Sequence, residues 1–542
     1  MNRSLRSVYV LLFVGVCFFA VGPLAGLLVR VFSHPEYFEI LIEKETLRAL
    51  YQTVRLCGGA LVAALMLALP LSWLLVRTDL PGRGPLRRIF QFPYMLPPYL
   101  FAIAWATLAI PTVGFLNRWF GNWINIYSAM GLIWVFATAY LPILTSSLCQ
   151  ALESMDPSLE ESARVCGAGP VRVAFLVTFP CLLPTIASVS LLFLLAVLSA
   201  FGVPALIGNP ARLYVLTTRI YSYAKLGGLS GTDKAFAVSL WLVGGAIVFI
   251  AINEWLRRRF LTRLVVGKAA RHSLVSLGRG RLPLWILTAS TAFIIVILPL
   301  AAIFLSSFLR VAGDLRPANF TIDNYAYLFE MAEFSRSVIN SLYLAGVTGV
   351  VCVVVAFFIA YFCDRTRMPL RTLFENLASF PFAIPGAVIA LALIVSFGSG
   401  WGFRRFALLG SPLLLLIAYV VKYLALSVQN MVPAMASLDP NLDEAGRVSG
   451  AGPWGVLLRI LAPLLFPAFL HVFMLTVLPV LSELTMSVLL TGPGLETLGT
   501  LMFQLQEYAQ PSAACALATL LVAFLVVLVG GARRLGALRR KV

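Results

Sequence analysis

The chain has 542 residues, of which 60% are hydrophobic and 12% are charged, and its mean hydropathy is +0.92. Soluble domains carry about a quarter charged residues, so this composition excludes a soluble enzyme or binding module. The formal net charge of +18 is explained by short basic segments on the cytoplasmic side of a membrane, and it does not indicate a nucleic-acid partner. The chain is therefore predicted to be an all-α protein of the lipid bilayer.

Apolar runs long enough to cross a bilayer, which takes about 20 residues at helical rise, occur along the whole chain. About twelve spanning helices are predicted, at residues 8–32, 48–77, 89–110, 127–148, 179–203, 236–257, 285–309, 336–363, 376–398, 411–430, 464–490 and 513–532. The segments that follow spans two, six, eight and twelve are basic, which places both termini in the cytoplasm. One segment departs from this rule, because it carries Arg212, Arg219, Lys225 and Lys234 but falls outside the cell.

An internal repeat relates the two halves of the chain. Residues 154–185 match residues 437–468 without a gap at roughly half of the positions, and many matched residues are polar or conformationally special. A weaker match relates FPYMLPPYL, starting at residue 92, to FPFAIPGAV, starting at residue 380. We therefore predict two parallel six-helix repeats, at residues 1–256 and 285–542, joined by a basic cytoplasmic linker at 257–284.

Each copy of the repeat lies between the fourth and fifth spans of its half and is longer than a simple connection needs to be. An Asp-Pro pair opens the first short helix, with the aspartate as its N-cap. A Gly-Ala-Gly-Pro sequence then ends this helix, at Gly167–Pro170 and Gly450–Pro453. Because glycine tolerates positive φ and proline favours the first turn of a helix, we predict a sharp turn into a second, amphipathic helix. The segment should protrude as a helical elbow.

The spacing within the elbow resembles the EAA loop of binding-protein-dependent ABC importer permeases. The first copy supplies Glu161, Ser162, Ala163, Gly167, Val177, Phe179 and Pro180, and the second supplies Glu444, Ala445, Gly446, Gly450, Ile460, Ala462 and Pro463. The departures replace small residues by small ones or apolar residues by apolar ones. The resemblance implies a type I ABC importer permease fold in a bacterial inner membrane and a homodimeric ABC ATPase as partner. It also implies a periplasmic substrate-binding protein that delivers the cargo.

In that family the elbow passes the movement of the ATPase to the membrane helices. The residues that the resemblance assigns to coupling are Glu161, Ala163, Arg164, Gly167, Gly169, Glu444, Ala445, Arg447, Gly450 and Gly452. The sequence contains no G-x-x-x-x-G-K-[ST] phosphate loop, so we expect ATP to be used by the partner and not by this chain. The chain is thus predicted to be a transport subunit and not an enzyme, with no cofactor of its own.

Within the family, the fused halves and the segments at 198–210, 216–221 and 481–499 resemble ferric-iron permeases most. Permeases for thiamine, phosphonate or polyamine remain alternatives. The eight cysteines are scattered without a CxxC pair and indicate no metal site.

Glu483 and Lys422 are two of the ionisable residues that fall within predicted spans. Glu483, near the outer end of the span at 464–490, is a candidate for the translocation path, because an ionisable group in a membrane is costly. The alternative is a carboxylate that bonds the neighbouring Thr485 or Ser487 and holds a bend. Lys422 could line a cavity, but it lies near enough to the cytoplasmic end of its span that we expect its amine to extend to the interface.

Two other classes of protein fit less well. A secondary transporter of the major facilitator type also has twelve spans in two parallel halves. However, its connection between spans four and five is short, whereas the strongest repeat of this chain lies there, and the spans here hold few carboxylates for ion coupling. A membrane enzyme would need a catalytic constellation, and the sequence shows none.

Overall fold

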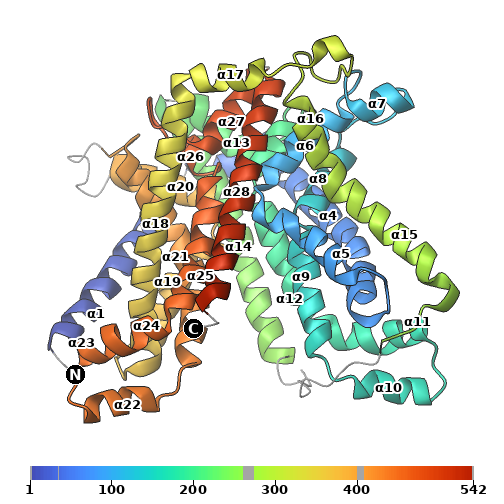
Figure 1. Ribbon diagram of the computed structural model, residues 1–542. Helices are drawn as coiled ribbons and strands as arrows, with labels where there is room; N and C mark the ends of the chain where they lie inside the picture. Colours follow the sequence, from blue (N-terminus) through green and yellow to red (C-terminus); the bar gives the residue numbers. More distant parts are fainter. Residues whose placement is uncertain are drawn as a thin grey trace.

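The computed structural model describes residues 3–34, 36–226, 228–260, 274–398, 408–508 and 510–539. Within these residues the protein is built from helices, as Figure 1 shows, and the β contacts consist of isolated bridges. Among the described residues, eight helices are long and apolar enough to cross a membrane, and four further pairs of helices qualify when each bent pair is taken as one span. The all-α fold is confirmed, and the bent pairs bring the number of spans to the predicted twelve.

The first half contains spans one to six in chain order, with an elbow before span five. Its elements are α1 (Arg3–Val16), η1 (Cys17–Val21), α2 (Gly22–Phe32), α3 (Glu36–Ile42), α4 (Lys44–Arg77), α5 (Arg83–Gln91), η2 (Phe92–Met95), α6 (Pro98–Ala109), α7 (Phe115–Phe120), α8 (Ala129–Ala139), α9 (Leu141–Ser154), α10 (Ser158–Val165), α11 (Pro170–Val173), η3 (Ala174–Thr178), α12 (Phe179–Leu198), η4 (Pro204–Gly208), α13 (Leu216–Leu226) and α14 (Gly228–Phe260).

The second half repeats this order. Its elements are η6 (Gly278–Gly280), α15 (Arg281–Ala292), η7 (Phe293–Ile297), α16 (Leu298–Ser306), η8 (Pro317–Asn319), α17 (Asp323–Glu330), α18 (Ala332–Arg365), α19 (Arg371–Ser379), η9 (Phe380–Ala383), α20 (Gly386–Gly398), α21 (Pro412–Ala436), α22 (Asn441–Val448), α23 (Pro453–Gly455), η11 (Val456–Leu461), α24 (Ala462–Leu464), α25 (Phe466–Leu481), α26 (Ser487–Leu490), α27 (Leu498–Glu507) and α28 (Pro511–Arg539). Single π-helical turns recur at matching places, in the first span of each half and in each elbow arm.

The third span of each half is not the straight helix that the apolar runs at 89–110 and 376–398 predict. The chain bends by 105° between Arg83–Met95 and Pro98–Ala109, and by 108° between Arg371–Ala383 and Gly386–Gly398. Both bends fall at the paired prolines that the two halves share. Proline lacks the amide hydrogen of a helix interior and disfavours a helical residue before it, so the helix ends and restarts in a new direction.

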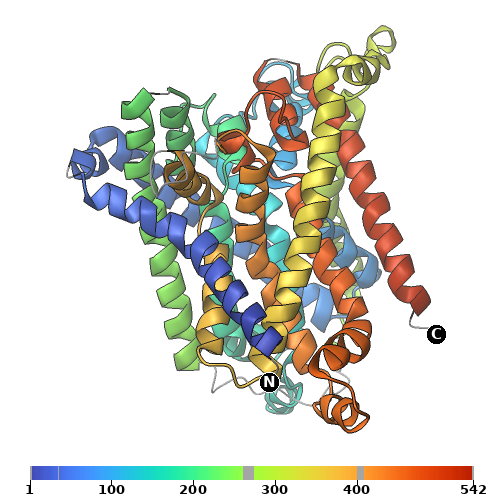
Figure 2. The ribbon, with the colours of Figure 1, turned by 90° about the vertical axis from the view of Figure 1, so that its left-hand side faces the viewer.

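The first span of each half crosses to the other half. Helix α2 packs against α20, and α16 packs against α6. Figure 2 shows α1 and α2 running obliquely across one face from the N-terminus. Tyr9 of α1 contacts the rings of Phe362 and Phe374, and its hydroxyl donates to the carbonyl of Pro369 at 2.5 Å. Each half is therefore completed by a helix from the other.

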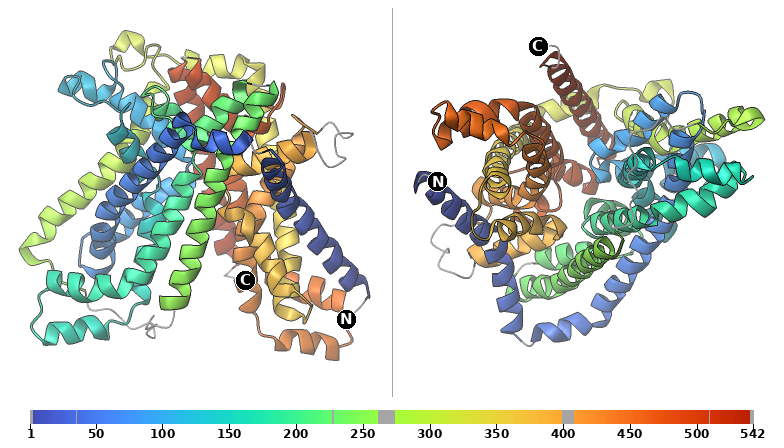
Figure 3. Two further views of the ribbon diagram at one scale, coloured as in Figure 1. Left: turned by 180° about the vertical axis from the view of Figure 1, so that it is seen from behind. Right: turned by 90° about the horizontal axis from the view of Figure 1, so that it is seen from below.

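The two halves meet at one end of the molecule and diverge at the other. Figure 1 and the left view of Figure 3 show α13, α17 and α27 at the closed end and the elbow helices α10 and α22 at the splayed end. Both chain ends point toward the elbow end. The backbones of the two halves thus lie farther apart at the elbows than at the other end.

The basic segment that departs from the charge rule is neutralised by acidic neighbours. Arg219 pairs with Glu45, Lys225 pairs with Glu507 at 3.2 Å, and Lys234 lies 3.9 Å from Glu43. Three of its four cations therefore sit in ion pairs at the closed end.

The end of the linker returns to the first half. The amide of Val275 donates to the carbonyl of Arg77 at 2.9 Å, and the amide of Asp79 donates to the carbonyl of Val275 at 3.1 Å. The Asp79 carboxylate also accepts from the amide of Leu277 at 3.0 Å. These bonds hold the start of the second half against the end of α4. Residues 261–273 of the predicted linker lie outside the described residues.

Candidate functional site

The two elbows start in the same way. The Asp156 carboxylate accepts from the amide of Ser158 at 2.9 Å, and the Asp439 carboxylate accepts from the amide of Asn441 at 2.9 Å. Each aspartate satisfies an amide that a helix start leaves without an intrahelical partner. The Asp-Pro pair precedes the eight-residue helices α10 and α22 in both copies, but the N-cap of each helix is the proline. The prediction that the aspartate is the N-cap is therefore off by one residue.

A glycine with positive φ ends each elbow helix. The φ angle is +83° at Gly167 and +82° at Gly450, in the left-handed region that a β-carbon disfavours. Gly169 and Gly452 instead have extended backbone and precede the proline that opens the next helix. The turn that the sequence predicts is present, and only the first glycine of each pair requires positive φ.

The structure places the predicted coupling residues around the tips of the elbows. The exposed members are Glu161, Gly167, Gly169, Glu444, Ala445, Arg447, Gly450 and Gly452, whereas Ala163 and Arg164 are partly buried. Between them stand the matched valines Val165 and Val448, each 89% exposed. An apolar side chain so exposed at the same place in both elbows is typical of a contact surface for a partner.

The carboxylates that the elbows bury are Glu160 and Asp443, one position before the predicted Glu161 and Glu444. Glu160 is 3% exposed and Asp443 is 7% exposed. The Glu160 carboxylate lies 3.1 Å from Nε of Arg77 and accepts from the hydroxyl of Thr178 at 2.7 Å. Sequence reasoning missed both residues, although an acid at this position in each copy and an Arg-Thr pair at the end of each second span were visible signals.

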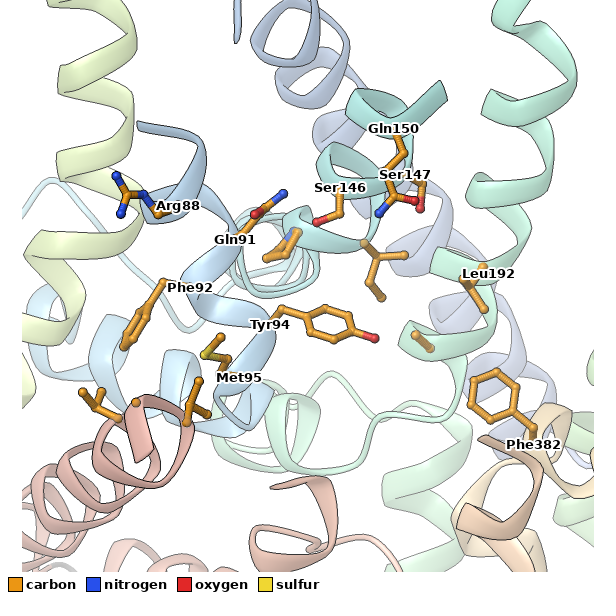
Figure 4. Close-up of a pocket in the computed structure, with 16 residues that line it drawn as sticks. Arg88, Gln91, Phe92, Tyr94, Met95, Ser146, Ser147, Gln150, Leu192 and Phe382 are labelled. Atoms are coloured by element: carbon orange, nitrogen blue, oxygen red, sulfur yellow. The ribbon is translucent and has the colours of Figure 1, made fainter. Parts of the chain in front are cut away.

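A cavity of about 750 Å³ lies between the halves. Figure 4 shows Gln91, Tyr94 and Ser146 on one side of it and Leu192 and Phe382 on the other. Its lining comes from α5, η2, α9 and α12 of the first half and from η9 and α28 of the second: Arg88, Gln91, Phe92, Tyr94, Met95, Pro142, Ile143, Ser146, Ser147, Gln150, Leu192, Ala196, Phe382, Val526, Val529 and Gly530. Sequence analysis did not identify these residues, because they come from six separate elements.

Glu483 lies within its predicted span at 464–490 but beyond the end of the observed helix, since α25 ends at Leu481. Its side chain is buried, and its carboxylate accepts from the amides of Met486 and Ser487 at 2.9 and 3.0 Å and from the hydroxyl of Ser487 at 2.8 Å. The carboxylate therefore caps the short helix α26. Of the two alternatives that the sequence left open, the bond to Ser487 is observed, and a role in the path stays a prediction.

Lys422 does not extend to the membrane interface, so that expectation is wrong. Its ammonium donates to the carbonyl of Ile384 at 3.0 Å, in the break of the third span. The bend leaves this carbonyl without a helical partner, and the lysine supplies one. Lys422 also interacts electrostatically with Glu483. Lys422, a partly buried charge on α21, thus contacts the broken third span and interacts with the residue that caps α26.

Known proteins resemble this chain over most of its length. The ferric transport system permease protein FbpB of Actinobacillus pleuropneumoniae is 25% identical over 494 residues, which cover 86% of this chain and 68% of that protein. The Fe(3+)-transport system permease protein FbpB 2 of Haemophilus influenzae is 25% identical over 488 residues, which cover 90% of this chain and 89% of that protein.

A shorter relative matches a single segment. The molybdenum transport system permease protein ModB of Escherichia coli K12 is 28% identical over 217 residues, which cover 39% of this chain and 93% of that protein. The family described as binding-protein-dependent transport system inner membrane component matches residues 58–262 and 353–535, one segment in each half and more than half of the chain in all. The chain therefore belongs to this family of inner membrane transport components.

Proposed function

We propose that this protein is the fused permease subunit of an ATP-driven importer for ferric iron. The observation that carries the proposal is the pair of exposed elbows with the same helix start and the same glycine turn on one chain, in a family of binding-protein-dependent transport components. The iron assignment is supported by the two ferric permeases that this chain matches over 86% and 90% of its length. We infer that residues 1–256 and 285–542 are two copies of one permease unit, joined by the linker at 257–284.

In this proposal each elbow docks on one subunit of a homodimeric ABC ATPase, which binds and hydrolyses the ATP. The exposed side chains of the coupling residues, which exclude the glycines, form the docking surface together with the valines at the elbow tips. A periplasmic binding protein delivers the cargo at the closed end, and the cavity between the halves receives it. The elbow end and both termini then face the cytoplasm of a bacterium. Movement of the elbows toward each other would close the splayed end and open the other.

Iron uptake tests the assignment of the cargo. In a strain without other ferric importers, expression of this permease with its partner ATPase and binding protein should restore accumulation of radioactive iron. The same strain with an empty vector is the control. Accumulation of thiamine, a phosphonate, a polyamine or molybdate in place of iron would contradict the ferric assignment, and uptake that persists without the ATPase would contradict the importer class.

The two elbows predict a complex of one permease chain with two ATPase chains. Native mass spectrometry of the purified complex should give this ratio, with a permease mass of 59.1 kDa. Val165 and Val448 are each 89% exposed, so the double variant Val165→Asp/Val448→Asp should lose the ATPase through a buried charge but keep its melting temperature. A stable complex with a single ATPase chain would contradict this prediction.

A further inference from the structure

The elbow of the first half is tied to two membrane spans through one buried carboxylate. Glu160 of α10 pairs with Arg77 at the end of α4 and accepts from Thr178 at the start of span five. Arg164, one turn along α10, lies 3.8 Å from the second oxygen of Glu160. Arg77 is 1% exposed and Thr178 is fully buried. A charged pair buried this deeply holds its elements in one arrangement, because separation leaves a charge without a partner.

The linker strengthens this attachment. Its residue Val275 pairs with the backbone of Arg77 and Asp79, directly at the end of α4 where the guanidinium of Arg77 reaches Glu160. The second span, the elbow and the start of the second half are therefore joined at one point.

The matched position in the second half is built differently. Asp443 has a shorter side chain than Glu160, and the residue that matches Thr178 is the buried Leu461, which offers no hydroxyl. Arg365, which corresponds to Arg77, donates to the carbonyls of Met435 and Leu438 at 3.0 and 2.6 Å. Within the described residues, Oδ1 of Asp443 has no hydrogen-bond partner, and burial raises the pKa of this carboxyl. Asp443 still interacts electrostatically with Arg365 and Arg447. Among the described residues, the second elbow nevertheless lacks the close ion pair and the hydroxyl bond that attach the first.

The path from elbow to span also differs. In the first half, Pro170–Leu198 forms one continuous helix from the elbow through span five. In the second half, Pro453–Leu464 and Phe466–Leu481 are bent by 70° at the same place. A continuous helix transmits a displacement along its axis, whereas a break at a proline-rich joint absorbs part of it.

We propose that Glu160 is a positioning residue that makes the first elbow the principal route by which the ATPase moves the membrane spans. The second elbow docks on the ATPase but is hinged to its spans. This inference rests on the proposed function, because it assigns unequal roles to the two docking elbows of that importer.

The matched variants Glu160→Gln and Asp443→Asn test the inference in proteoliposomes with the partner ATPase and binding protein. The measured quantity is the ATP hydrolysed per iron taken up. Glu160→Gln should raise this ratio by at least about fivefold, the lower end of typical coupling between two sites, and Asp443→Asn should change it by less than about twofold. Equal ratios for the two variants, or a larger effect of Asp443→Asn, would overturn the proposal.

Thr178→Val is a milder variant that tests the same attachment if Glu160→Gln fails to fold. It removes one hydroxyl and keeps the ion pair of Glu160 with Arg77. We expect it to raise the ratio in the same direction but by less than Glu160→Gln does. The reverse change, Asp443→Glu with Leu461→Thr, supplies the second elbow with the longer acid and the hydroxyl that the first elbow has. In a chain that already carries Glu160→Gln, it should lower the ATP hydrolysed per iron below the value for Glu160→Gln alone. An unchanged ratio in Thr178→Val at normal ATPase binding would contradict the attachment.

Hydrogen exchange of the purified permease separates a failure of this inference from a failure of the proposed function, because it needs neither ATPase nor cargo. Glu160→Gln should speed amide exchange in α10 by about tenfold or more, since local opening no longer breaks the ion pair. Asp443→Asn should leave exchange in α22 unchanged. Exchange in α10 that stays as slow as in the native protein would overturn the attachment, whatever the protein transports.

Discussion

Replacement of Gly167 by valine should reduce uptake to about a tenth or less, although the protein still inserts into the membrane. Gly167 has a φ of +83°, and an L-residue in this region costs about 1–2 kcal/mol, with a β-branched residue at the upper end. A cost of this size shifts the equilibrium of the turn about tenfold toward other backbone conformations. The tip of the elbow then points in another direction. Uptake and the amount of permease in the membrane measure the result.

The neighbouring glycine supplies the matched control. Gly169 has a φ of −67° and no atom within 4 Å of the place where a β-carbon would stand, so Gly169→Ala should keep native uptake. Gly167→Asn should lie between the two, because asparagine tolerates the left-handed region. In the second elbow we expect the same order of uptake, lowest in Gly450→Val, intermediate in Gly450→Asn and native in Gly452→Ala. Equal uptake in Gly167→Val and Gly169→Ala would show that the turn is not required.

Replacement of Glu483 by alanine should destabilise the protein and reduce uptake to about a tenth or less. The carboxylate accepts from two amides and one hydroxyl in a buried site. Each buried donor left without a partner costs about 1–3 kcal/mol, and the charge that faces Lys422 is lost as well. Thermal unfolding in detergent, followed together with iron uptake, measures both effects.

Glu483→Gln distinguishes a cap from a residue of the path. Glutamine keeps an acceptor oxygen for α26, so a cap predicts a smaller drop in melting temperature than in Glu483→Ala, with uptake falling in proportion to the folded fraction. A residue that contacts a passing cation would lose uptake even where the melting temperature is retained, because the negative charge is gone. A Glu483→Ala protein as stable as the native one would contradict the cap.

The elbows could be predicted from the sequence because their signals act locally. An aspartate before a proline fixes a helix start, and a glycine with its following proline fixes the turn, whatever the rest of the chain does. Which of two neighbouring carboxylates points inward is not decided by the local sequence. Glu160 and Glu161 are adjacent acids in the sequence, and only the position of Arg77, 83 residues away, selects Glu160 for burial.

The broken third spans and the role of Lys422 could not be predicted in the same way. Hydropathy measures the length of an apolar run, and a bend of 105° leaves that length unchanged. The paired prolines marked both places, but their consequence depends on what satisfies the freed carbonyl. In the second half that group is Lys422, whose partner Ile384 lies 38 residues earlier in the chain. The cavity depends on still more distant pairs.

The exchange of first spans between the halves has a consequence for biogenesis. Helix α2 ends at Phe32, but its packing partner α20 begins at Gly386, so at typical synthesis rates the first span waits roughly 20 to 70 s for that partner. It can wait safely, because a helix in lipid satisfies its own backbone. Once α20 has been inserted, the covalent connection gives the two a high effective concentration. A cell that makes several permeases of this family would thereby avoid pairing a half of one with a half of another.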